Sequence, residues 1–435
     1  MKSSTFQYIL LVIFGFLGVF GVLVFAGIIP IGGEGATYEG AVTLWGSVPE
    51  RDMDLVLSDF NKENEDLFTL NYVYKDKQTF ENDLINALAK GEGPDLVMIT
   101  NDLIIKQGDK LLTIPFETYP ERTFKDTFVE AGEIFLTKDG TLALPLYADP
   151  MIMYWNRDLF TNAGLVTYPK TWTDFLNISE KLTKKDNKGN VFQSAVAMGS
   201  YKNISNAKDI LTTLFLQVGD NIISKNTGVG DTLSKLYNST LGGTSRGAGS
   251  AIDFFVEFSN PAKSAYSWNP SLSNSKSLFS EGKLAVYFGK ASEYYGIKAN
   301  NPHLNFDVAL MPQREDSSLK VTSADVIGIA VVKASEKQGT ALRALYSLTG
   351  NNYGKIISGL LPLPSLRRDV LATAEKDPVL SVFNSSAIIS RTWYDPDASA
   401  SDIIFRSLVE AVNSGRQSAS EAIRDAQIKF LEYVK

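Results

Sequence analysis

The residues that most enzymes use for nucleophilic, acid–base or metal chemistry are scarce in this chain. It has no cysteine and one histidine, His303. Disulfides, thiolate metal sites, a lipidated N-terminal cysteine and most Ser-His-Asp or zinc schemes are therefore excluded. We expect His303, in the polar stretch NNPHLN, to be an ordinary surface residue. A glycosidase needs two carboxylates at a fixed separation across a cleft, which the sequence does not indicate. We expect no catalytic residues, no metal and no cofactor.

Aromatic rings, carboxylates and amides remain, and these groups bind hydroxyl-rich solutes reversibly. Rings stack on the CH faces of such solutes, and the polar groups pair with their hydroxyls. Trp45 ends the first apolar run, where it could stack on a ligand or lie in the core. Trp393 and Tyr394 lie in the Pro- and Asp-rich stretch TWYDPDAS, where exposed rings favour a ligand contact. Trp268 is a weaker candidate of the same kind.

Predicted strands and helices alternate over the first part of the chain. Strands are expected at 41–45, 67–75 and 94–100, with a helix over 52–64 and another that ends at Gly91. The strands are mostly continuous apolar runs, which is typical of a parallel sheet covered on both faces. Ligands of such sheets bind beyond the carboxyl ends of the strands, so the loops WGSVPE and TNDL are expected to reach a ligand.

The rest of the chain is predicted to add a second lobe. Residues 171–288 are interpreted as largely helical, and their Gly/Ser-rich part, 224–250, lacks the features of a phosphate loop. Strands are expected at 305–312 and 327–333, and helices from residue 341 onward. The late strands would rejoin the first sheet. At 435 residues the chain is long for one core, so we expect two lobes joined by more than one crossing.

The N-terminal segment is interpreted as a membrane anchor. No charge occurs between Lys2 and Glu34. As a helix, residues 8–31 would span about 36 Å, which is enough to cross a bilayer. The apolar run is longer than that of most signal peptides and AGIIPIGG is a poor cleavage site, although a cleaved signal is the alternative. Lys2 would place the N-terminus in the cytoplasm and the main body outside the membrane.

Five motifs, in order along the chain, resemble those of the family 1 extracellular solute-binding proteins, which are maltose-binding-like proteins of ABC importers. MYWNRDLFTNAGL followed by PKTWTDFLNISEKLT is similar to the family segment YNKDLFKKAGL…PPKTWDEL. The other four motifs are GEGPDLVMITND, LFSEGKLAVYFG, FDVALMPQ and SGRQSASEAIRDAQIKF. Together the five motifs cover nearly all of residues 40–432.

This resemblance implies an α/β fold with two lobes, of the periplasmic-binding-protein-like type II. After an anchor and spacer at 1–36, lobe I would comprise residues 37–147 and about 305–345. Lobe II would comprise residues 148–304 and about 346–435. LPLYADP and NFDVALMP would be the crossings between the lobes.

The resemblance also implies ligand contacts in lobe I and at the hinge. Asp102, preceded by Asn101, matches a ligand-binding carboxylate after the third strand, although it could instead cap the next helix. Asp149, close to Tyr147 in LPLYADP, matches an acidic ligand-binding position, and a turn role before Pro150 is the alternative. Glu50 corresponds either to a polar ligand contact or to a solvated charge.

In lobe II the resemblance implies a second set of contacts. Asn206 and Asp209 open a helix at a position that corresponds to a ligand loop of the family. Ser292 stands where several sugar binders carry a stacking tryptophan, so Tyr294 or Tyr295 would have to supply the ring. Trp155 is instead expected in the core, and Asn156 is expected to cap a helix.

The resemblance implies a receptor that closes its lobes on a carbohydrate, or another small polar solute, and delivers it to an ABC permease. Acidic residues at the expected contacts favour neutral or cationic solutes over anions. The net charge of −7 argues against a nucleic-acid partner, and a monomer is expected. The alternative is a surface sensor or interaction module that reuses the fold without transport.

Overall fold

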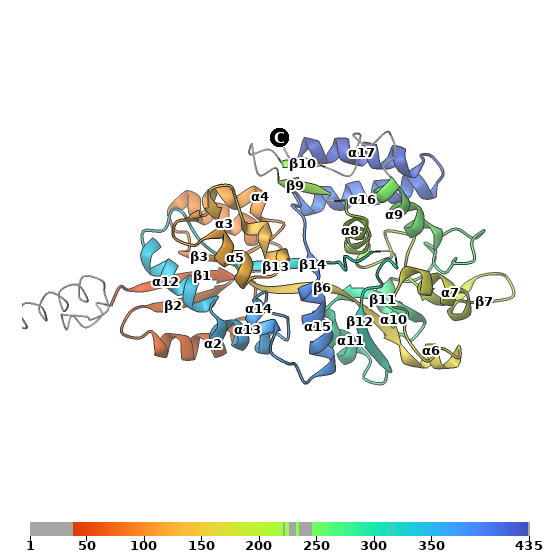
Figure 1. Ribbon diagram of the computed structural model, residues 1–435, viewed down its shortest axis with the longest axis horizontal. Coiled ribbons are helices and arrows are strands. Elements are labelled where there is room, and N and C mark those ends of the chain that lie inside the picture. Colours follow the sequence, from red (N-terminus) through yellow and green to blue (C-terminus); the bar gives the residue numbers. More distant parts are fainter. Residues whose placement is uncertain (1–37, 221, 226–231, 235–245, 316, 434–435) are drawn as a thin grey trace, which may run out of the picture.

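The computed structural model describes residues 38–220, 222–225, 232–234, 246–315 and 317–433. These residues form two α/β lobes arranged along the long axis of the molecule and joined through the middle of one sheet (Figure 1). The strand order is β2-β1-β3-β13-β6-β11-β8-β7, with β12 beside β6 and β14 beside β13. The predicted two-lobed α/β architecture is confirmed. The predicted anchor, residues 8–31, lies outside the described residues, in which no helix is long and apolar enough to cross a membrane.

Lobe I follows the predicted alternation of strands and helices. Its strands β1 and β2, and β1 and β3, pair in parallel. Successive β3 residues face opposite sides of the sheet, so that Leu96 and Met98 pack in one core and Val97 and Ile99 in another. The elements are β1 (Ala41–Gly46), α2 (Glu50–Glu63), β2 (Thr69–Tyr74), α3 (Phe80–Lys90), β3 (Leu96–Thr100), α4 (Ile104–Gln107), η1 (Gly108–Lys110), β4 (Ile114–Pro115), α5 (Glu121–Thr127), η2 (Glu130–Phe135), β5 (Gly140–Thr141), α12 (Gln338–Leu348), α13 (Asn351–Leu360) and α14 (Arg368–Leu371).

Lobe II surrounds one large core rich in aromatic side chains, among them Tyr154, Phe175, Trp268 and Phe405. Its elements are α6 (Arg157–Asn162), α7 (Trp172–Leu182), β7 (Lys184–Lys185), β8 (Val191–Val196), α8 (Ala207–Gln217), β9 (Ile223–Lys225), β10 (Thr232–Ser234), α9 (Arg246–Glu257), α10 (Ser275–Ser280), β11 (Leu284–Lys290), α11 (Glu293–Asn300), β12 (Phe306–Leu310), α15 (Pro378–Ile388), β14 (Ser390–Arg391), α16 (Ala398–Asn413) and α17 (Ala419–Glu432). The expectation that 171–288 is largely helical was wrong at β8 and β11. Both are short, mostly buried strands of a mixed sheet, and short buried runs resemble buried helix segments.

Two long strands carry the chain between the lobes. β6 (Leu144–Asn156) pairs with β13 (Thr322–Val331) through its first half and with β11 through its second half. β13 in turn pairs with β3 of lobe I. LPLYADP therefore lies in a crossing, as predicted. NFDVALMP does not: its strand β12 pairs antiparallel with the second half of β6 and stays in lobe II, and β13 makes the return crossing.

The hydrophobic cores also move two of the expected lobe boundaries. Val308 and Ala309, which were assigned to lobe I, pack in the core of lobe II. Tyr353 and Ile357 of α13, which were assigned to lobe II, pack in the lobe I core. Sequence order suggested one change of lobe after each crossing, but burial of the apolar helix face decides where each segment packs.

Capping residues near the end of β6 determine where the first two helices of lobe II begin. Asn156 is the N-cap of α6, and its side-chain oxygen accepts a hydrogen bond from the Leu159 amide at 3.0 Å. Gly164 follows the helix with a φ of 71°, a left-handed conformation that costs glycine little. The next helix, α7, begins with a capping box between Thr171 and Asp174. Caps at both helices explain why a short polar helix separates the strand from α7.

We expect Asn156→Ala to lower the free energy of unfolding by about 1 kcal/mol, because the Leu159 amide would lose its acceptor. Asn156→Asp keeps an acceptor at the same place and is the matched control. Denaturant unfolding of the three proteins measures the difference. Equal losses in the two variants would show that the cap contributes nothing.

Candidate ligand-binding site

A cavity of about 260 Å³ lies between the lobes, beyond the carboxyl end of β3. Both lobes and the crossing strand β13 contribute polar side chains to its wall. The lining residues are Lys77, Thr100, Asn101, Asp102, Lys208, Asp209, Thr212, Lys290, Ser323, Ala324, Asp325, Thr392, Trp393, Asp395 and Ala398. We call it the interlobe cavity.

Lobe I supplies the wall at the end of β3. Asn101 is buried, and its side-chain oxygen accepts a hydrogen bond from the Val326 amide at 2.9 Å, which ties β3 to β13. Asp102 is half-buried and accepts a hydrogen bond from the Thr100 hydroxyl. The Asn101 side-chain oxygen therefore links the two strands. The Asp102 carboxylate, which lines the cavity, can still accept hydrogen bonds from a ligand.

Lobe II supplies the opposite wall from α8 and from the segment before α16. The Lys208 ammonium pairs with Asp395 and contacts the Ser401 hydroxyl at 2.7 Å. The same ammonium lies 5.7 Å from the centre of the Trp393 ring, within cation–π range. Trp393 is only 6% exposed and packs edge-on against Phe405. It is thus a core residue that also faces the cavity.

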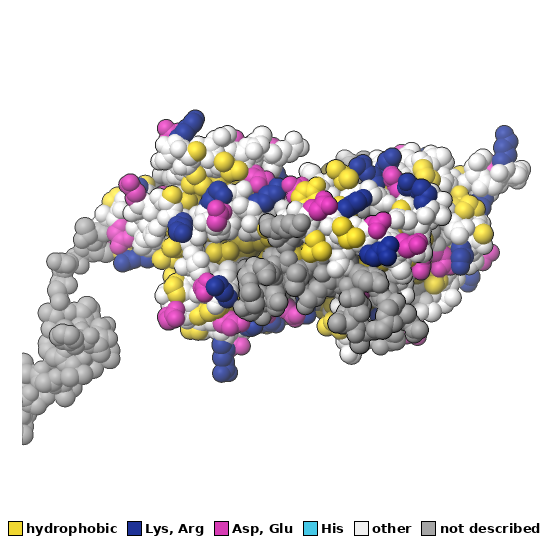
Figure 2. Space-filling model, turned by 90° about the horizontal axis from the view of Figure 1, so that it is seen from above, with side chains coloured by type: hydrophobic (Ala, Val, Ile, Leu, Met, Phe, Trp, Pro, Cys, Tyr) yellow, Lys and Arg dark blue, Asp and Glu magenta, His cyan; other side chains and the backbone are white. Residues whose placement is uncertain are grey.

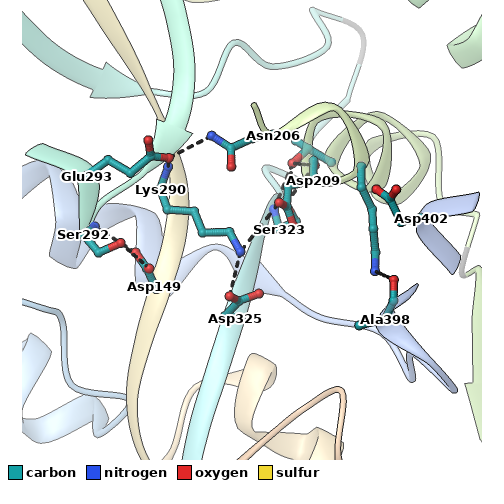
Figure 3. Close-up of polar contacts among 12 residues, drawn as sticks. Asp149, Asn206, Asp209, Lys290, Ser292, Glu293, Ser323, Asp325, Ala398 and Asp402 are labelled. Atoms are coloured by element: carbon teal, nitrogen blue, oxygen red, sulfur yellow. Dashed lines mark hydrogen bonds and ion pairs between the residues drawn. The ribbon is translucent and has the colours of Figure 1, made fainter. Parts of the chain in front are cut away.

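A cluster of Lys290, Asp209 and Asp325 forms the floor of the cavity near the hinge (Figure 3). The Lys290 ammonium lies 2.6 Å from a carboxylate oxygen of Asp325 and 3.6 Å from one of Asp209. Burial lowers the pKa of Lys290, but Asp209 and Asp325 outweigh it and raise the pKa above its usual value. Burial raises the pKa of Asp209, whereas the close ion pair lowers that of Asp325 against the effect of burial. The closer carboxylate is therefore the firmly ionised partner. We call these three residues the Lys290 cluster.

Asp149 lies behind this cluster. Its two carboxylate oxygens accept hydrogen bonds from the Ser292 amide at 2.9 Å and from the Ser292 hydroxyl at 2.6 Å. Burial raises the pKa of Asp149 to about 6, although the bonds from Ser292 act in the opposite direction. Figure 3 shows Ser292 and Asp149 facing each other and not Lys290. The serine is thus fixed by the hinge strand β6.

The raised pKa of Asp149 predicts a pH-dependent contribution to stability. Between about pH 4 and 6 the folded chain holds a proton on Asp149 that the unfolded chain has lost, so this contribution falls as the pH rises. The loss amounts to about 2–3 kcal/mol. We expect the stability of Asp149→Asn relative to the wild type to increase by this amount from pH 4 to pH 7 in denaturant titrations. A constant difference between the two proteins would contradict the shift.

The lobes also touch outside the cavity. Lys106 of α4 lies 2.8 Å from Asp397, the N-cap residue of α16. The Tyr394 hydroxyl donates a hydrogen bond to the Ile134 carbonyl of lobe I at 3.0 Å. On the face shown in Figure 2, acidic and basic side chains of the described residues are intermixed over both lobes and do not form a basic patch. These contacts hold the two lobes together around the cavity.

Comparison with known proteins identifies the family. Residues 56–379, more than half of the chain, match the family model described as bacterial extracellular solute-binding protein. The chain belongs to this family.

Solved structures share the fold of this solute-binding protein along nearly its whole length. A cyclo/maltodextrin-binding protein complexed with maltotetraose has a TM-score of 0.73 at 16% identity, over 92% of this chain and 99% of that one. The cyclic α-maltosyl-1,6-maltose binding protein of Arthrobacter globiformis has a TM-score of 0.74 at 15% identity, over 91% and 99%. The maltose-binding periplasmic protein of Listeria monocytogenes, in complex with maltose, has a TM-score of 0.69 at 17% identity, over 91% and 98%.

Similarity to curated relatives is more local. A binding protein of Brucella abortus is 29% identical over 116 residues, which are 26% of this chain. The solute-binding protein spans 28% of the length of that relative. This match is a second, local similarity to a binding protein.

Four residues expected to contact a ligand are brought together in the interlobe cavity. They are Asn101, Asp102, Asp209 and Trp393. They come from both lobes, so the rule that ligands bind beyond the carboxyl ends of strands and the family resemblance lead to the same place. The two loop hypotheses differ in outcome: TNDL lines the cavity, whereas the residues of WGSVPE do not.

The other expected contacts lie away from this cavity. Trp45 packs in a lobe I core with the Lys75 ammonium 4.0 Å above its ring, and Glu50 is exposed in the first turn of α2. Tyr147 is half-buried beside the lobe I core. Trp268 is fully buried and donates a hydrogen bond to Asn203.

The remaining five expected contacts also lie outside the lining of the cavity and are held by neighbouring residues of the protein: Asp149, Asn206, Ser292, Tyr294 and Tyr394. Asn206 donates hydrogen bonds to the Tyr287 hydroxyl at 2.9 Å and to Glu293 at 2.8 Å, as part of a network behind α8. Tyr294 packs against Phe306 and Phe383 in the lobe II core. Ser292, as described above, is bonded to Asp149. Tyr394 reaches Ile134 across the lobes, as noted above.

None of the three basic residues that line the cavity was predicted from the sequence. Lys77, Lys208 and Lys290 all line it, as do Thr212, Asp325 and Asp395. A signal was present for two of them: Asp325 interrupts an apolar strand, and Lys290 ends another one. A charge in a strand that is buried on both faces needs a partner, and each of these two is the partner of the other.

Proposed function

We propose that this protein binds a carbohydrate, or a related hydroxyl-rich solute, in the interlobe cavity and delivers it to an ABC importer. The observation that carries the proposal is the cavity itself. Polar side chains from both lobes converge on it together with one aromatic ring, Trp393. Closure of two lobes about the β6 and β13 crossings would bring these groups onto a ligand. The fold is that of proteins solved with maltotetraose, maltose and mannotriose bound.

The proposal includes a tether. Residues 8–31 would cross the membrane and hold the two lobes outside it, replacing the lipid that a cysteine would carry. Membrane fractionation of the full chain and of a chain that starts at Thr37 tests this. The full chain is expected in the membrane fraction after a high-salt wash, and the shorter chain in the soluble fraction.

Thermal and denaturant unfolding of the chain from Thr37, with a panel of mono- and oligosaccharides, tests the binding role. A saccharide at about 100 times its dissociation constant should add roughly 2.7 kcal/mol of stability. Trp393→Phe and Asp102→Asn should weaken that effect, because both side chains line the cavity. Glu50→Gln is the matched control, since Glu50 is exposed outside the cavity.

A sensor or interaction module without transport is the second candidate. Two ion pairs favour this alternative, Lys208 with Asp395 and Lys290 with Asp325. In both pairs, charged groups that line the cavity are already paired with each other and do not need a ligand. Under this alternative no solute of the panel would shift the unfolding transition, and the two lobes would keep one relative position. Small-angle scattering with and without the panel separates the two roles, because ligand-driven closure would reduce the radius of gyration.

A further inference from the structure

Carboxylates outnumber ammonium groups in the interlobe cavity. Its lining contains four aspartates and three lysines, namely Asp102, Asp209, Asp325, Asp395, Lys77, Lys208 and Lys290. Asp149 adds a further carboxylate that acts on Lys290 from behind. The wall therefore has more negative than positive charge, even though lysines are well represented in it.

The two half-buried ammonium groups, those of Lys208 and Lys290, already have partners within the protein. Lys208 pairs with Asp395, and Lys290 with Asp325 at 2.6 Å. Lys77 is the third lysine of the lining, and it is exposed. An anionic solute would thus have to compete with internal carboxylates for both inner lysines, or rely on Lys77 alone.

Two carboxylates, one from each lobe, are left with spare acceptor capacity. Among the described residues, the Asp102 side chain has the Thr100 hydroxyl as its hydrogen-bond donor. Within the described part of the chain, the Asp209 side chain has the longer ion pair with Lys290, at 3.6 Å, as its one close polar contact. A carboxylate offers about four lone-pair sites, so both groups can accept further hydrogen bonds from a ligand.

An independent observation comes from Thr212, one turn after Asp209 on α8. Thr212 is 2% exposed and lines the same cavity. Its hydroxyl is buried and has no hydrogen-bond partner within the described residues. Residues three apart on a helix lie on the same face, so Thr212 and Asp209 lie on the same side of α8. A buried hydroxyl without a partner is costly, and a ligand donor or acceptor at this place would satisfy it.

We propose that the interlobe cavity selects a small polar solute that carries an ammonium group, such as an amino sugar, with the ammonium between Asp102 and Asp209 and a neighbouring polar group on Thr212. The inference rests on the proposed function, since it takes this cavity as the place where the solute binds. An ammonium has three donors and no acceptor, which suits carboxylates that lack donors. When the lobes close over a neutral sugar, the excess carboxylates lose their water and gain no opposite charge in return. A cationic ligand supplies that opposite charge.

Matched probes test the charge preference. Isothermal titration of the chain from Thr37 at pH 6.5 would use glucosamine, galactosamine and mannosamine, each beside its parent hexose and its N-acetyl form, with putrescine as an amine that is not a sugar. We expect at least one amino sugar to bind at least tenfold more tightly than both of its neutral counterparts. Asp209→Asn should remove most of this ratio, whereas Asp253→Asn, an exposed change on α9, should preserve it.

The outcomes separate the two proposals. Neutral sugars that bind as tightly as their amino forms would overturn the charge preference and leave the carbohydrate role intact. Putrescine binding without any sugar binding would support the preference for an ammonium and overturn the carbohydrate role. Binding of no probe would overturn the preference for an ammonium group, whereas the carbohydrate role is overturned only if the oligosaccharides of the unfolding panel also have no effect. A tenfold preference that Asp209→Asn leaves unchanged would overturn the assignment of the ammonium to this cavity.

Discussion

Lys290→Met is expected to lower the free energy of unfolding by about 3–5 kcal/mol at pH 7.5. The ammonium of Lys290 lies 2.6 Å from Asp325 and 3.6 Å from Asp209, and Asp149 is close enough to raise its pKa. Without the cation, these half-buried carboxylates would face one another without compensation. The loss should shrink toward pH 5, because the carboxylates can then take up protons. Denaturant unfolding at both pH values measures it.

Lys283→Met provides a control from the other end of the same strand. Lys283 precedes β11, and its ion pair with Glu281 at 2.8 Å is exposed on both sides. Such surface pairs contribute little, so this variant should stay within about 0.5 kcal/mol of the wild type. A similar small effect at Lys290 would show that water enters the cavity and screens the cluster. Asp325→Asn in the Lys290→Met background should restore part of the stability, because it removes one of the uncompensated charges.

Local features of the fold could be predicted because their causes lie within a few residues. Asn156 caps α6 as expected, and the C-cap of α3 is Gly91 in the left-handed conformation. The alternation of apolar strands and amphipathic helices in lobe I depends on periodicity, which a sequence displays directly. The strands β8 and β11 were harder, since a short buried apolar run has the same pattern in a strand as in a helix.

The return crossing was misassigned because pairing partners far apart in sequence leave no local pattern. β12 and β13 both contain apolar runs, and the sequence alone does not show that β12 pairs with β6 while β13 reaches β3. Only part of the cavity could be predicted, because some of its residues are also brought together by strands far apart in sequence. Asp102 follows a strand end and could be found by a topological rule. Lys290 and Asp325 are 35 residues apart and meet only because β11 and β13 both lie beside β6.

The aromatic residues were the least reliable of the predicted ligand contacts. Trp268, which is buried in the lobe II core instead, allows this to be tested. We expect Trp268→Ala to lower the free energy of unfolding by about 3–5 kcal/mol, since the indole is fully buried in the lobe II core. Trp268→Phe retains much of the volume but removes the hydrogen bond from the indole nitrogen to Asn203, 3.0 Å long, and should cost about 1–2 kcal/mol. Denaturant unfolding measures both losses.

A core role and a ligand role for Trp268 predict opposite patterns in the phenylalanine variant. The indole lies outside the interlobe cavity, whereas Trp393 lines it. Once a ligand is known, Trp268→Phe should keep the wild-type dissociation constant while its stability falls, and Trp393→Phe should weaken binding. Unchanged stability with lost binding in Trp268→Phe would instead place the ring in the ligand site. Both tryptophans are buried, and contact with the cavity separates them: Trp393 lines it and Trp268 does not. A sequence shows both only as aromatic residues in polar surroundings.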